Sequence, residues 1–462
     1  MDSKLLTRPS RRRSGRILTN IIWLAAIFLF VVPNYLTGVA RASAGDLVAG
    51  FGSGGKVTTD FYNNNYDSVF AVATYPDGKI LLAGTSRSTT EDFVYDIALA
   101  RYNPDGSLDQ TFGNGGLVKT DFNEMESARA VAIQPDGKIV VAGTISRFDG
   151  STDFAVLRYH EDGTLDSSFG QGGLVSTDFY NTVDSAADLA ITPNGEIVVA
   201  GTVWWVTDFV DSDFAVVRYD SDGNLDMTFG DHGKVTVHSE IDEDLAAMVL
   251  TPKGQIVLAG TRTSVPGEGY NVDFVLFRFN RDGSLDASFG IDGRVITDFS
   301  AVDTLSDVAL TSDGDIIAVG TAQPTPGHLD FVVARYNRNG RLDPSFGTAG
   351  SVITDFSMRD DFAFAVAVRS NGKIVVAGTS GWVTGRGQND FALARYERDG
   401  TLDQSFGSGG LLTTDFAGDT DEAKAVAILP SGRIVVAGNR WDWTNQSFYP
   451  SVDFALVEYE WR

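Results

Sequence analysis

A sequence repeat constrains the fold of this chain more than any other feature. Four short apolar segments recur in one order, as in residues 130–134, 138–144, 153–159 and 173–179, and no stretch has the longer period of a helix. The dipeptide Phe-Gly marks seven copies of this unit, spaced 57 to 61 residues apart, at Phe51, Phe112, Phe169, Phe229, Phe289, Phe346 and Phe406. We therefore predict an all-β protein made of four-stranded units.

The strands of each unit are joined by tight turns and are apolar on both faces. Pro135-Asp136-Gly137 joins a first strand to a second, because Pro presets φ and Gly takes the positive φ. Strands with two apolar faces must be covered on both sides, which radial stacking of the units achieves. We predict a seven-bladed β-propeller of four-stranded blades. A lone fourth strand at 56–61 should pair with the last third strand at 453–459 and close the ring.

Three motifs resemble a known family. They are FGxGGxVxTDF, PDGKIVVAG and DFALARYNxDGxLDxSFG, and together they extend over residues 45–462. In combination they are similar to the bacterial delta-60 repeat, a β-propeller family of exported proteins. The resemblance implies a propeller fold and export. It implies no reaction, because the family has no general assigned activity.

The first 44 residues differ from the repeats. Basic residues, among them Arg11, Arg12 and Arg13, precede an apolar stretch at 21–32, and Ala42-Ser43-Ala44 fits a small-x-small cleavage pattern. This layout predicts a signal peptide over residues 1–44, followed by a single propeller domain over residues 45–462. The alternative is an uncleaved signal anchor helix, with residues 17–32 in the membrane. We therefore expect an exported protein, periplasmic or extracellular, that touches a membrane only through this segment if it is not cleaved.

Composition excludes several classes of site and partner. The chain has no Cys and 4 His, and its formal net charge is -25, or -31 once the basic leader is removed. Without Cys it has no disulfides, thiolate metal ligands or Cys nucleophiles. The negative charge disfavours nucleic acid and anionic membrane surfaces as partners. We expect a monomer with no cofactor.

An Arg and an Asp recur on either side of the turn after the third strand in six units. The two side chains should face each other across the hairpin. We predict the ion pairs Arg101–Asp109, Arg158–Asp166, Arg218–Asp226, Arg278–Asp286, Arg335–Asp343 and Arg395–Asp403. In the seventh unit Glu458 and Val48 take these positions. The alternative is calcium, because Asn103, Asp105 and Asp109 have the spacing of an acidic calcium loop, although Arg101 stands in the first ligand position.

Alternating strand direction places the loops after the second and fourth strands on one side, which we call the loop face. These loops vary between units, and variable loops on one face of a repeat protein often bind ligands. They carry aromatic residues outside the repeated core positions: Trp204, Trp205, Tyr270, Trp382, Trp441 and Trp443, together with Phe148, Phe448 and Tyr449. These residues either cap their own blades or contact a ligand.

An Asp opens the third strand of every unit. The seven are Asp96, Asp153, Asp213, Asp273, Asp330, Asp390 and Asp453, and we expect them to form a carboxylate ring on the loop face. The favoured interpretation is structural, because a short Asp side chain accepts hydrogen bonds from loop N–H groups. The alternative is that this ring and the nearby loop acids attract a cationic partner or a divalent ion.

These features favour a non-enzymatic recognition propeller that binds a glycan or an extracytoplasmic protein on the loop face. The first alternative is a glycan lyase or hydrolase that uses two of the loop-face carboxylates. The sequence offers many acids and selects no pair, so we predict no catalytic residue. The second alternative is a structural surface protein.

Overall fold

The computed structural model describes residues 42–61, 66–87, 94–147, 150–180, 182–206, 210–238, 241–263, 271–325, 327–356, 359–382, 389–416, 420–443 and 451–462. It separates Met1–Arg41 from a second unit, Ala42–Arg462, to which all of the described residues belong. Within the described ranges no helix is long and apolar enough to cross a membrane.

The described residues form an all-β structure of four-stranded antiparallel groups. Six groups follow the chain order: β2 (Asp67–Thr74), β3 (Ile80–Arg87), β4 (Tyr95–Tyr102) and β5 (Leu117–Thr120); β6 (Met125–Ile133), β7 (Ile139–Ser146), β8 (Thr152–Tyr159) and β9 (Leu174–Thr177); β10 (Val183–Ile191), β11 (Ile197–Val206), β12 (Val210–Tyr219) and β13 (Lys234–Val237); β14 (Glu243–Leu250), β15 (Ile256–Thr263), β16 (Val272–Phe279) and β17 (Arg294–Thr297); β18 (Asp303–Leu310), β19 (Ile316–Thr325), β20 (His328–Tyr336) and β21 (Ser351–Thr354); β22 (Asp360–Val368), β23 (Ile374–Trp382), β24 (Asp390–Tyr396) and β25 (Leu411–Thr414). One parallel bridge between Thr152 and Val183 links the second and third groups.

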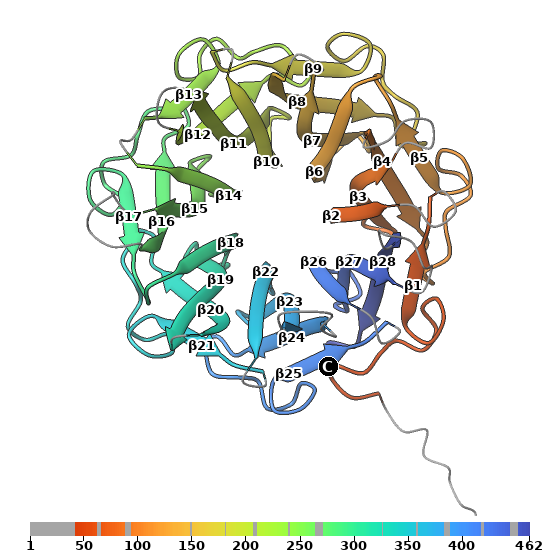
Figure 1. Ribbon diagram of the computed structural model, residues 1–462, viewed down its shortest axis with the longest axis vertical. Helices are drawn as coiled ribbons and strands as arrows, with labels where there is room; N and C mark the ends of the chain where they lie inside the picture. Colours follow the sequence, from red (N-terminus) through yellow and green to blue (C-terminus); the bar gives the residue numbers. More distant parts are fainter. Residues whose placement is uncertain are drawn as a thin grey trace, which may run out of the picture. The chain divides into compact units, whose positions relative to one another are not determined.

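The last group combines both ends of the described chain. It contains β26 (Asp421–Ile428), β27 (Ile434–Asp442), β28 (Ser451–Tyr459) and β1 (Lys56–Thr59). Strand β1 runs antiparallel to β28, with Lys56 opposite Val457 and Thr59 opposite Phe454. Figure 1 shows that the first strands of the groups, β2, β6, β10, β14, β18, β22 and β26, lie nearest a common centre.

The core lies between neighbouring groups. The second and third strands are buried on both faces, as their apolar sequences require: Ile80 to Ser86 are all buried. The Phe of every Phe-Gly pair is fully buried. The Phe in the third strand packs against the Phe that follows the fourth, with ring centroids 5.0 Å apart in both Phe61–Phe454 and Phe331–Phe356. Most of the Phe side chains therefore pack in the core between neighbouring groups.

Each first strand contains a β-bulge opposite a glycine. The pairing of β14 with β15 passes over Ala246, so that Leu245 faces Gly260 and Ala247 faces Ala259. A Cβ atom at position 260 would lie 2.0 Å from the carbonyl oxygen of Asp244, so only Gly fits there. The corresponding glycines of the seven groups are Gly84, Gly143, Gly201, Gly260, Gly320, Gly378 and Gly438.

Candidate functional site

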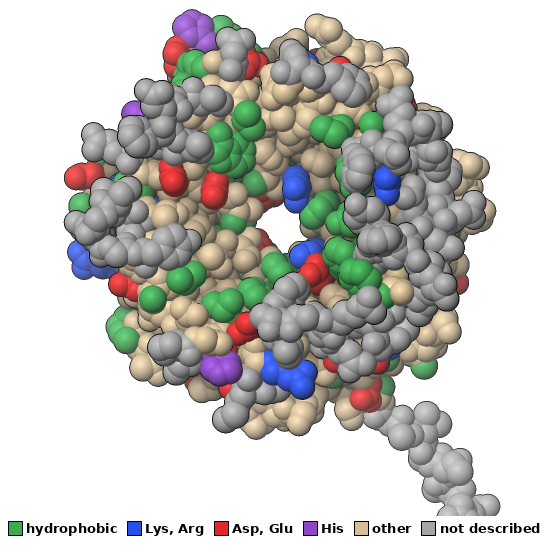
Figure 2. All heavy atoms as spheres, viewed as in Figure 1, with side chains coloured by type: hydrophobic (Ala, Val, Ile, Leu, Met, Phe, Trp, Pro, Cys, Tyr) green, Lys and Arg blue, Asp and Glu red, His purple; other side chains and the backbone are tan. Residues whose placement is uncertain are grey.

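The seven bulge residues lie together at the centre, and we call them the bulge cluster. They are Phe70, Arg129, Ala187, Ala246, Ser306, Phe364 and Lys424. All seven line one cavity of about 490 Å³, with Trp204 and Asp244 among the other lining residues. A bulge turns one extra side chain out of the regular alternation, and here it turns a variable residue towards the centre. Figure 2 shows the opening, with basic and hydrophobic side chains at its edge.

The bulge cluster has a basic, aromatic side and a side of small residues. In the order in which their strands contact each other, Phe364, Lys424, Phe70 and Arg129 come from β22, β26, β2 and β6. The Arg129 guanidinium lies 4.3 Å from the Phe70 ring centre, and the Lys424 ammonium lies 4.0 Å from that of Phe364. Ala187, Ala246 and Ser306 complete the cluster with small side chains and leave space for a ligand.

The two cations of the bulge cluster differ in their partners. Lys424 Nζ lies 3.1 Å from Glu422. No carboxylate in the described ranges lies within ion-pair distance of Arg129, and burial lowers the pKa of this guanidinium. On the opposite side of the cavity, desolvation and the neighbouring carboxylate of Asp242 raise the pKa of Asp244. The cavity therefore offers a fixed, partly desolvated cation and one acid that protonates more easily than usual.

A second cavity of about 310 Å³ adjoins the first and shares Phe70 and Arg129 with it. Tyr66 and Tyr95 line this cavity, with their ring centroids 5.8 Å apart. Trp441 meets Tyr66 edge to face at 6.0 Å and stacks on Trp443 at 6.5 Å. Trp443 is 43% exposed, so this aromatic group reaches the surface.

The structure separates the aromatic candidates of the sequence analysis into three sets. Trp204 lines the central cavity, and Trp441 and Trp443 belong to the aromatic group beside the second cavity. Trp205 instead stacks on Tyr180 and donates its indole N–H to Asp213 at 2.5 Å, which is a blade-capping arrangement. Tyr270, Phe148, Phe448, Tyr449 and the side chain of Trp382 lie outside the described residues.

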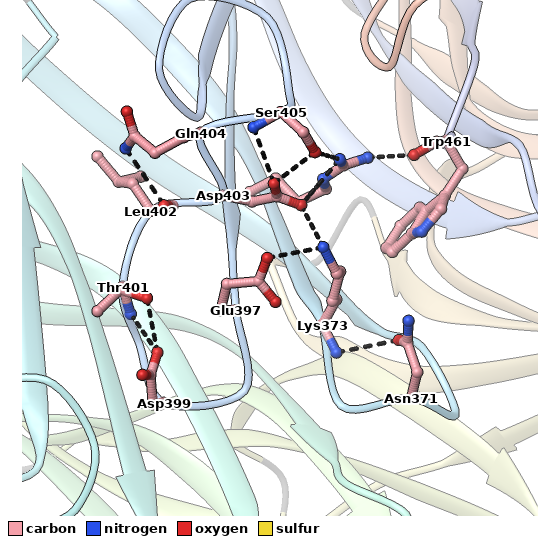
Figure 3. Close-up of polar contacts among 11 residues, drawn as sticks. Asn371, Lys373, Glu397, Asp399, Thr401, Leu402, Asp403, Gln404, Ser405 and Trp461 are labelled. Carbon is pink, nitrogen blue, oxygen red and sulfur yellow. Dashed lines mark hydrogen bonds and ion pairs between the residues drawn. The ribbon is translucent and has the colours of Figure 1, made fainter.

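The Arg and Asp side chains on either side of the third-strand turn lie in contact in all six units. Nε of the Arg donates to the Asp at 2.8 or 2.9 Å in Arg101–Asp109, Arg158–Asp166, Arg218–Asp226, Arg278–Asp286, Arg335–Asp343 and Arg395–Asp403. Figure 3 shows that Asp403 also accepts a hydrogen bond from the Ser405 hydroxyl and pairs with the Lys373 ammonium group. In the seventh unit, Glu458 instead pairs with Arg433, which directly precedes β27.

Each of these Arg side chains also reaches the next repeat. In the sixth unit, Arg395 Nη1 donates to the carbonyl oxygen of Trp461, and its guanidinium lies 4.5 Å from the ring centre of Phe406. The same two contacts recur in the other five units. The acceptors there are the carbonyls of Glu161, Ser221, Arg281, Arg338 and Arg398, and the rings are those of Phe112, Phe169, Phe229, Phe289 and Phe346.

The turn that resembles a calcium loop is filled by protein donors. Asp105 accepts the backbone N–H and the hydroxyl of Ser107, and Asp109 accepts those of Thr111 while pairing with Arg101. These contacts use Oδ1 of Asp105 and both carboxylate oxygens of Asp109. The third-strand Asp residues lie elsewhere, at the start of their strands, and most are buried.

Sequence reasoning missed the bulge cluster. Its signal is visible in retrospect: Arg129 and Lys424 interrupt first strands that are otherwise apolar, as in SARAVAI and EAKAVAI. A charged side chain within an apolar strand suggests a special backbone position. The direction in which this side chain points depends on the bulge, and the residue types of the first strand do not reveal where the bulge lies.

Comparisons with known proteins support a β-propeller repeat family. Six segments match the family described as a domain of unknown function (DUF5122) beta-propeller: residues 76–112, 134–169, 192–229, 252–289, 311–346 and 369–406. The chain matches no curated protein. The class that fold and comparison define is thus a β-propeller repeat protein.

Several solved structures share low similarity with the chain. A protein of unknown function from Dyadobacter fermentans is 13% identical, with 73% of this chain and 98% of that chain covered and a TM-score of 0.42. A polysaccharide lyase, the PL25 ulvan lyase, is 14% identical, with 87% and 96% covered and a TM-score of 0.43. An α-L-arabinofuranosidase from Fusarium graminearum is 10% identical, with 90% and 97% covered and a TM-score of 0.42. We draw no functional conclusion from similarity at this level.

Proposed function

We propose that this protein is an exported recognition propeller that binds an acidic glycan at the bulge cluster. The single observation that carries the proposal is the central cavity, where Arg129 has no carboxylate partner among the described residues and lies against Phe70. A carboxylate or sulfate group of a sugar would pair with this guanidinium. Trp204 and the aromatic group around Tyr66 supply flat surfaces for sugar rings.

We further propose that seven blades close into a ring around this cavity. The pairing of β1 with β28 and the contact between β2 and β26 support closure. A closed ring would hold the bulge residues of all seven groups at fixed separations. Such a rigid arrangement lowers the entropy cost of binding.

The charge of the protein argues that the binding is local. With a net charge of -25, long-range electrostatics repel an anionic ligand. At the cavity, the short-range attraction of Arg129 and Lys424 must exceed this repulsion. Moderate salt weakens the long-range repulsion and affects the close contact with Arg129 and Lys424 much less. The affinity should therefore not fall as the ionic strength is raised moderately.

The binding proposal is tested with substitutions in the bulge cluster. Acidic and neutral glycan panels are probed with the full chain, and any bound glycan is then titrated by calorimetry. We expect Arg129→Ala to weaken binding at least about tenfold, since it removes a charge at the centre of the site, and Trp204→Ala to weaken it less. Trp382→Ala tests a further candidate of the loop face.

The matched control is Arg398→Ala. Arg398 is exposed and pairs with Asp313 in the turns outside the loop face, so the variant removes the same charge away from the cavity. Equal affinities of Arg129→Ala and the unchanged chain would contradict the proposal, as would selective binding of a protein partner with no glycan bound.

A glycan-cleaving enzyme is the second candidate function. The raised pKa of Asp244 at the central cavity favours it, because a general acid must hold its proton near working pH. If bound glycans are shortened over time and Asp244→Asn abolishes the cleavage while binding persists, the protein is an enzyme. Intact glycans after prolonged incubation would favour recognition alone.

Export is part of the same proposal. Ala44 is buried in the second unit, and its carbonyl oxygen accepts a hydrogen bond from Gly407, so the proposed cleavage point adjoins the first packed residues of the propeller. Mass spectrometry of the protein from its native host should show a chain beginning at Gly45. A mass that includes residues 1–44 would instead indicate the anchor.

A further inference from the structure

Groups of three carboxylates recur where one four-stranded group meets the next. Each contains the Asp that opens a third strand, the Asp that follows the fourth strand, and an acid near the start of the next first strand. In each group, one carboxylate oxygen from each of the three residues lies within 4.8 Å of the other two: Asp60, Asp67 and Asp453; Asp96, Asp121 and Glu126; Asp153, Asp178 and Asp184; Asp273, Asp298 and Asp303; Asp330, Asp355 and Asp361. Oxygens bound to one calcium ion at about 2.4 Å have this largest separation.

The first-strand acid of each group is held in a fixed orientation. One of its oxygens accepts the backbone N–H of the Phe that follows the fourth strand, at 2.8 Å in Asp67 and Asp361 and at 2.6 Å in Asp184. A backbone bond of this kind is what orients a metal-binding carboxylate from behind.

The second oxygen of this acid distinguishes the groups. Asp67 Oδ1, Glu126 Oε2 and Asp361 Oδ1 are buried and accept no hydrogen bond of standard geometry from the described residues. The hydroxyls of Ser86 and Ser380 lie beside Asp67 and Asp361 and offset part of the rise in pKa that burial causes in these two acids. These three side chains are at most 1% exposed. In two other groups a hydroxyl fills the position, because Thr182 donates to Asp184 and Ser300 donates to Asp303. An unpartnered, buried carboxylate oxygen is costly unless a cation is bound to it.

Basic side chains pair with some of these acids. Lys119 lies 2.5 Å from Asp96, and Arg147 lies 2.6 Å from Asp153. Arg440 approaches Asp453 only to 3.6 Å. In the described ranges, neither Asp330 nor Asp361 has a Lys or Arg within ion-pair distance, and the charged neighbours of this pair are other acids and His328. The Ser380 hydroxyl lies near Asp361 and adds a possible oxygen ligand.

We propose that Asp330, Asp355 and Asp361 bind a calcium ion, and that Asp60, Asp67 and Asp453 form a second, weaker site. Both sites consist only of oxygen ligands, which calcium prefers, and each includes an open oxygen of a fully buried Asp. The ion would join the end of one four-stranded group to the first strand of the next, so it would stabilise the contact between them.

The third group provides a natural contrast. Its fourth strand is followed by His238 in place of Asp, and Asp213 accepts the Trp205 indole at 2.5 Å and His238 Nδ1 at 2.9 Å. Protein donors therefore take the position of the ion. Asp213 and Asp330 occupy the same place in their repeats and are both buried, so the two form a matched pair for substitution.

Calcium titration of the chelator-treated full chain tests the proposal. At neutral pH we expect calcium to bind with a dissociation constant between about 10⁻⁵ and 10⁻³ M and to raise the thermal midpoint. Asp330→Asn should weaken the first site at least about tenfold, because it removes one of three charges, whereas Asp213→Asn should leave the bound calcium unchanged. Circular dichroism in chelator compares the folding of both variants.

Two results would overturn the proposal. One is that the unsubstituted chain binds no calcium at about 1 mM free ion, in which case the carboxylates share protons instead. The other is that Asp213→Asn loses as much calcium as Asp330→Asn. If Asp330→Asn fails to fold, the titration of the unsubstituted chain, with its expected rise in midpoint, still decides between calcium and no calcium.

Discussion

One arginine in each of six repeats contacts three parts of the fold. Arg395 is 1% exposed, pairs with Asp403, lies over the Phe406 ring and donates to the Trp461 carbonyl. Arg suits this position because its planar guanidinium donates in several directions and stacks on an aromatic face at the same time. A Lys would supply only one of these contacts.

Breaking this buried pair should cost far more than breaking an exposed one. We expect Arg395→Met to lower the free energy of unfolding by about 3 kcal/mol, the low end of the range for a buried pair because Lys373 remains beside Asp403 at 2.6 Å. The exposed pair Arg398–Asp313 is the control, and Arg398→Met should cost less than about 1 kcal/mol. Chemical denaturation measures both, and similar losses would contradict this account.

The paired carboxylates should also set the acid stability. Burial alone would raise the pKa of Asp109, but hydrogen bonds from Thr111 and Lys79 and the charge of Arg101 more than offset this effect and hold that pKa well below its ordinary value. Asp166 and Asp403 behave alike. An acid whose pKa in the folded state is below its unfolded value of about 3.9 stabilises the protein above that pH. This stabilisation is lost as the pH falls through the folded-state pKa.

The stability that these three carboxylates contribute should therefore be lost between about pH 5 and about pH 2, as unfolding measurements across this range can show. Asp109→Asn cannot titrate, so this variant should be less stable at pH 5 and lose less on acidification. A stability that stays constant down to about pH 2 would contradict the prediction.

At the scale of strands, a tyrosine joins six of the seven described third strands to the fourth strand of the preceding group. The Tyr336 hydroxyl donates to Thr297 at 2.8 Å, and five other pairs are equivalent: Tyr102–Thr59, Tyr159–Thr120, Tyr219–Thr177, Tyr396–Thr354 and Tyr459–Thr414. In the remaining pair both partners change together, to Phe279 and Val237, which pack in one cluster. The fold therefore accommodates either both hydroxyls or neither at this position.

This observation predicts the outcome of a double-mutant cycle. Tyr336→Phe should cost about 1–3 kcal/mol, because the buried Thr297 hydroxyl loses its partner. Adding Thr297→Val should recover most of that loss and reproduce the pair found at Phe279 and Val237. Phe279→Tyr alone is the control and should destabilise, since Val237 offers no acceptor. Additive losses in urea unfolding would show that the two hydroxyls act independently.

At the scale of the whole propeller unit, β1 covers the edge of β28. Without β1, four residues of β28 would lose their backbone partners, and an apolar strand edge would be exposed. We expect a chain that lacks residues 1–61 to unfold at a lower temperature and to scatter light on heating. The control lacks only residues 1–41, which precede the unit. Identical melting of the two chains would show that β1 does not support the seventh group.

Much of this fold could be predicted from the sequence repeat alone. The strand order, the Phe positions and the Arg–Asp spacing follow from hydrogen bonding and burial within 60 or so residues of chain, where alternation and turn residues carry the information. The pairing of segments 56–59 and 454–457 follows from counting strands, since each unit needs four.

Only the tertiary structure decided what lies between repeats. The bulge cluster, the carboxylate groups and the Tyr–Thr pairs each join residues from different repeats, roughly 30 to 60 positions apart where the repeats are neighbours in the chain. Their contacts depend on a one-residue shift in strand pairing and on how neighbouring groups stack. A shift of one residue reverses the direction of a side chain while leaving the composition of the strand the same. The glycine opposite each bulge marks its place in the sequence, but it does not indicate which side chain turns towards the centre.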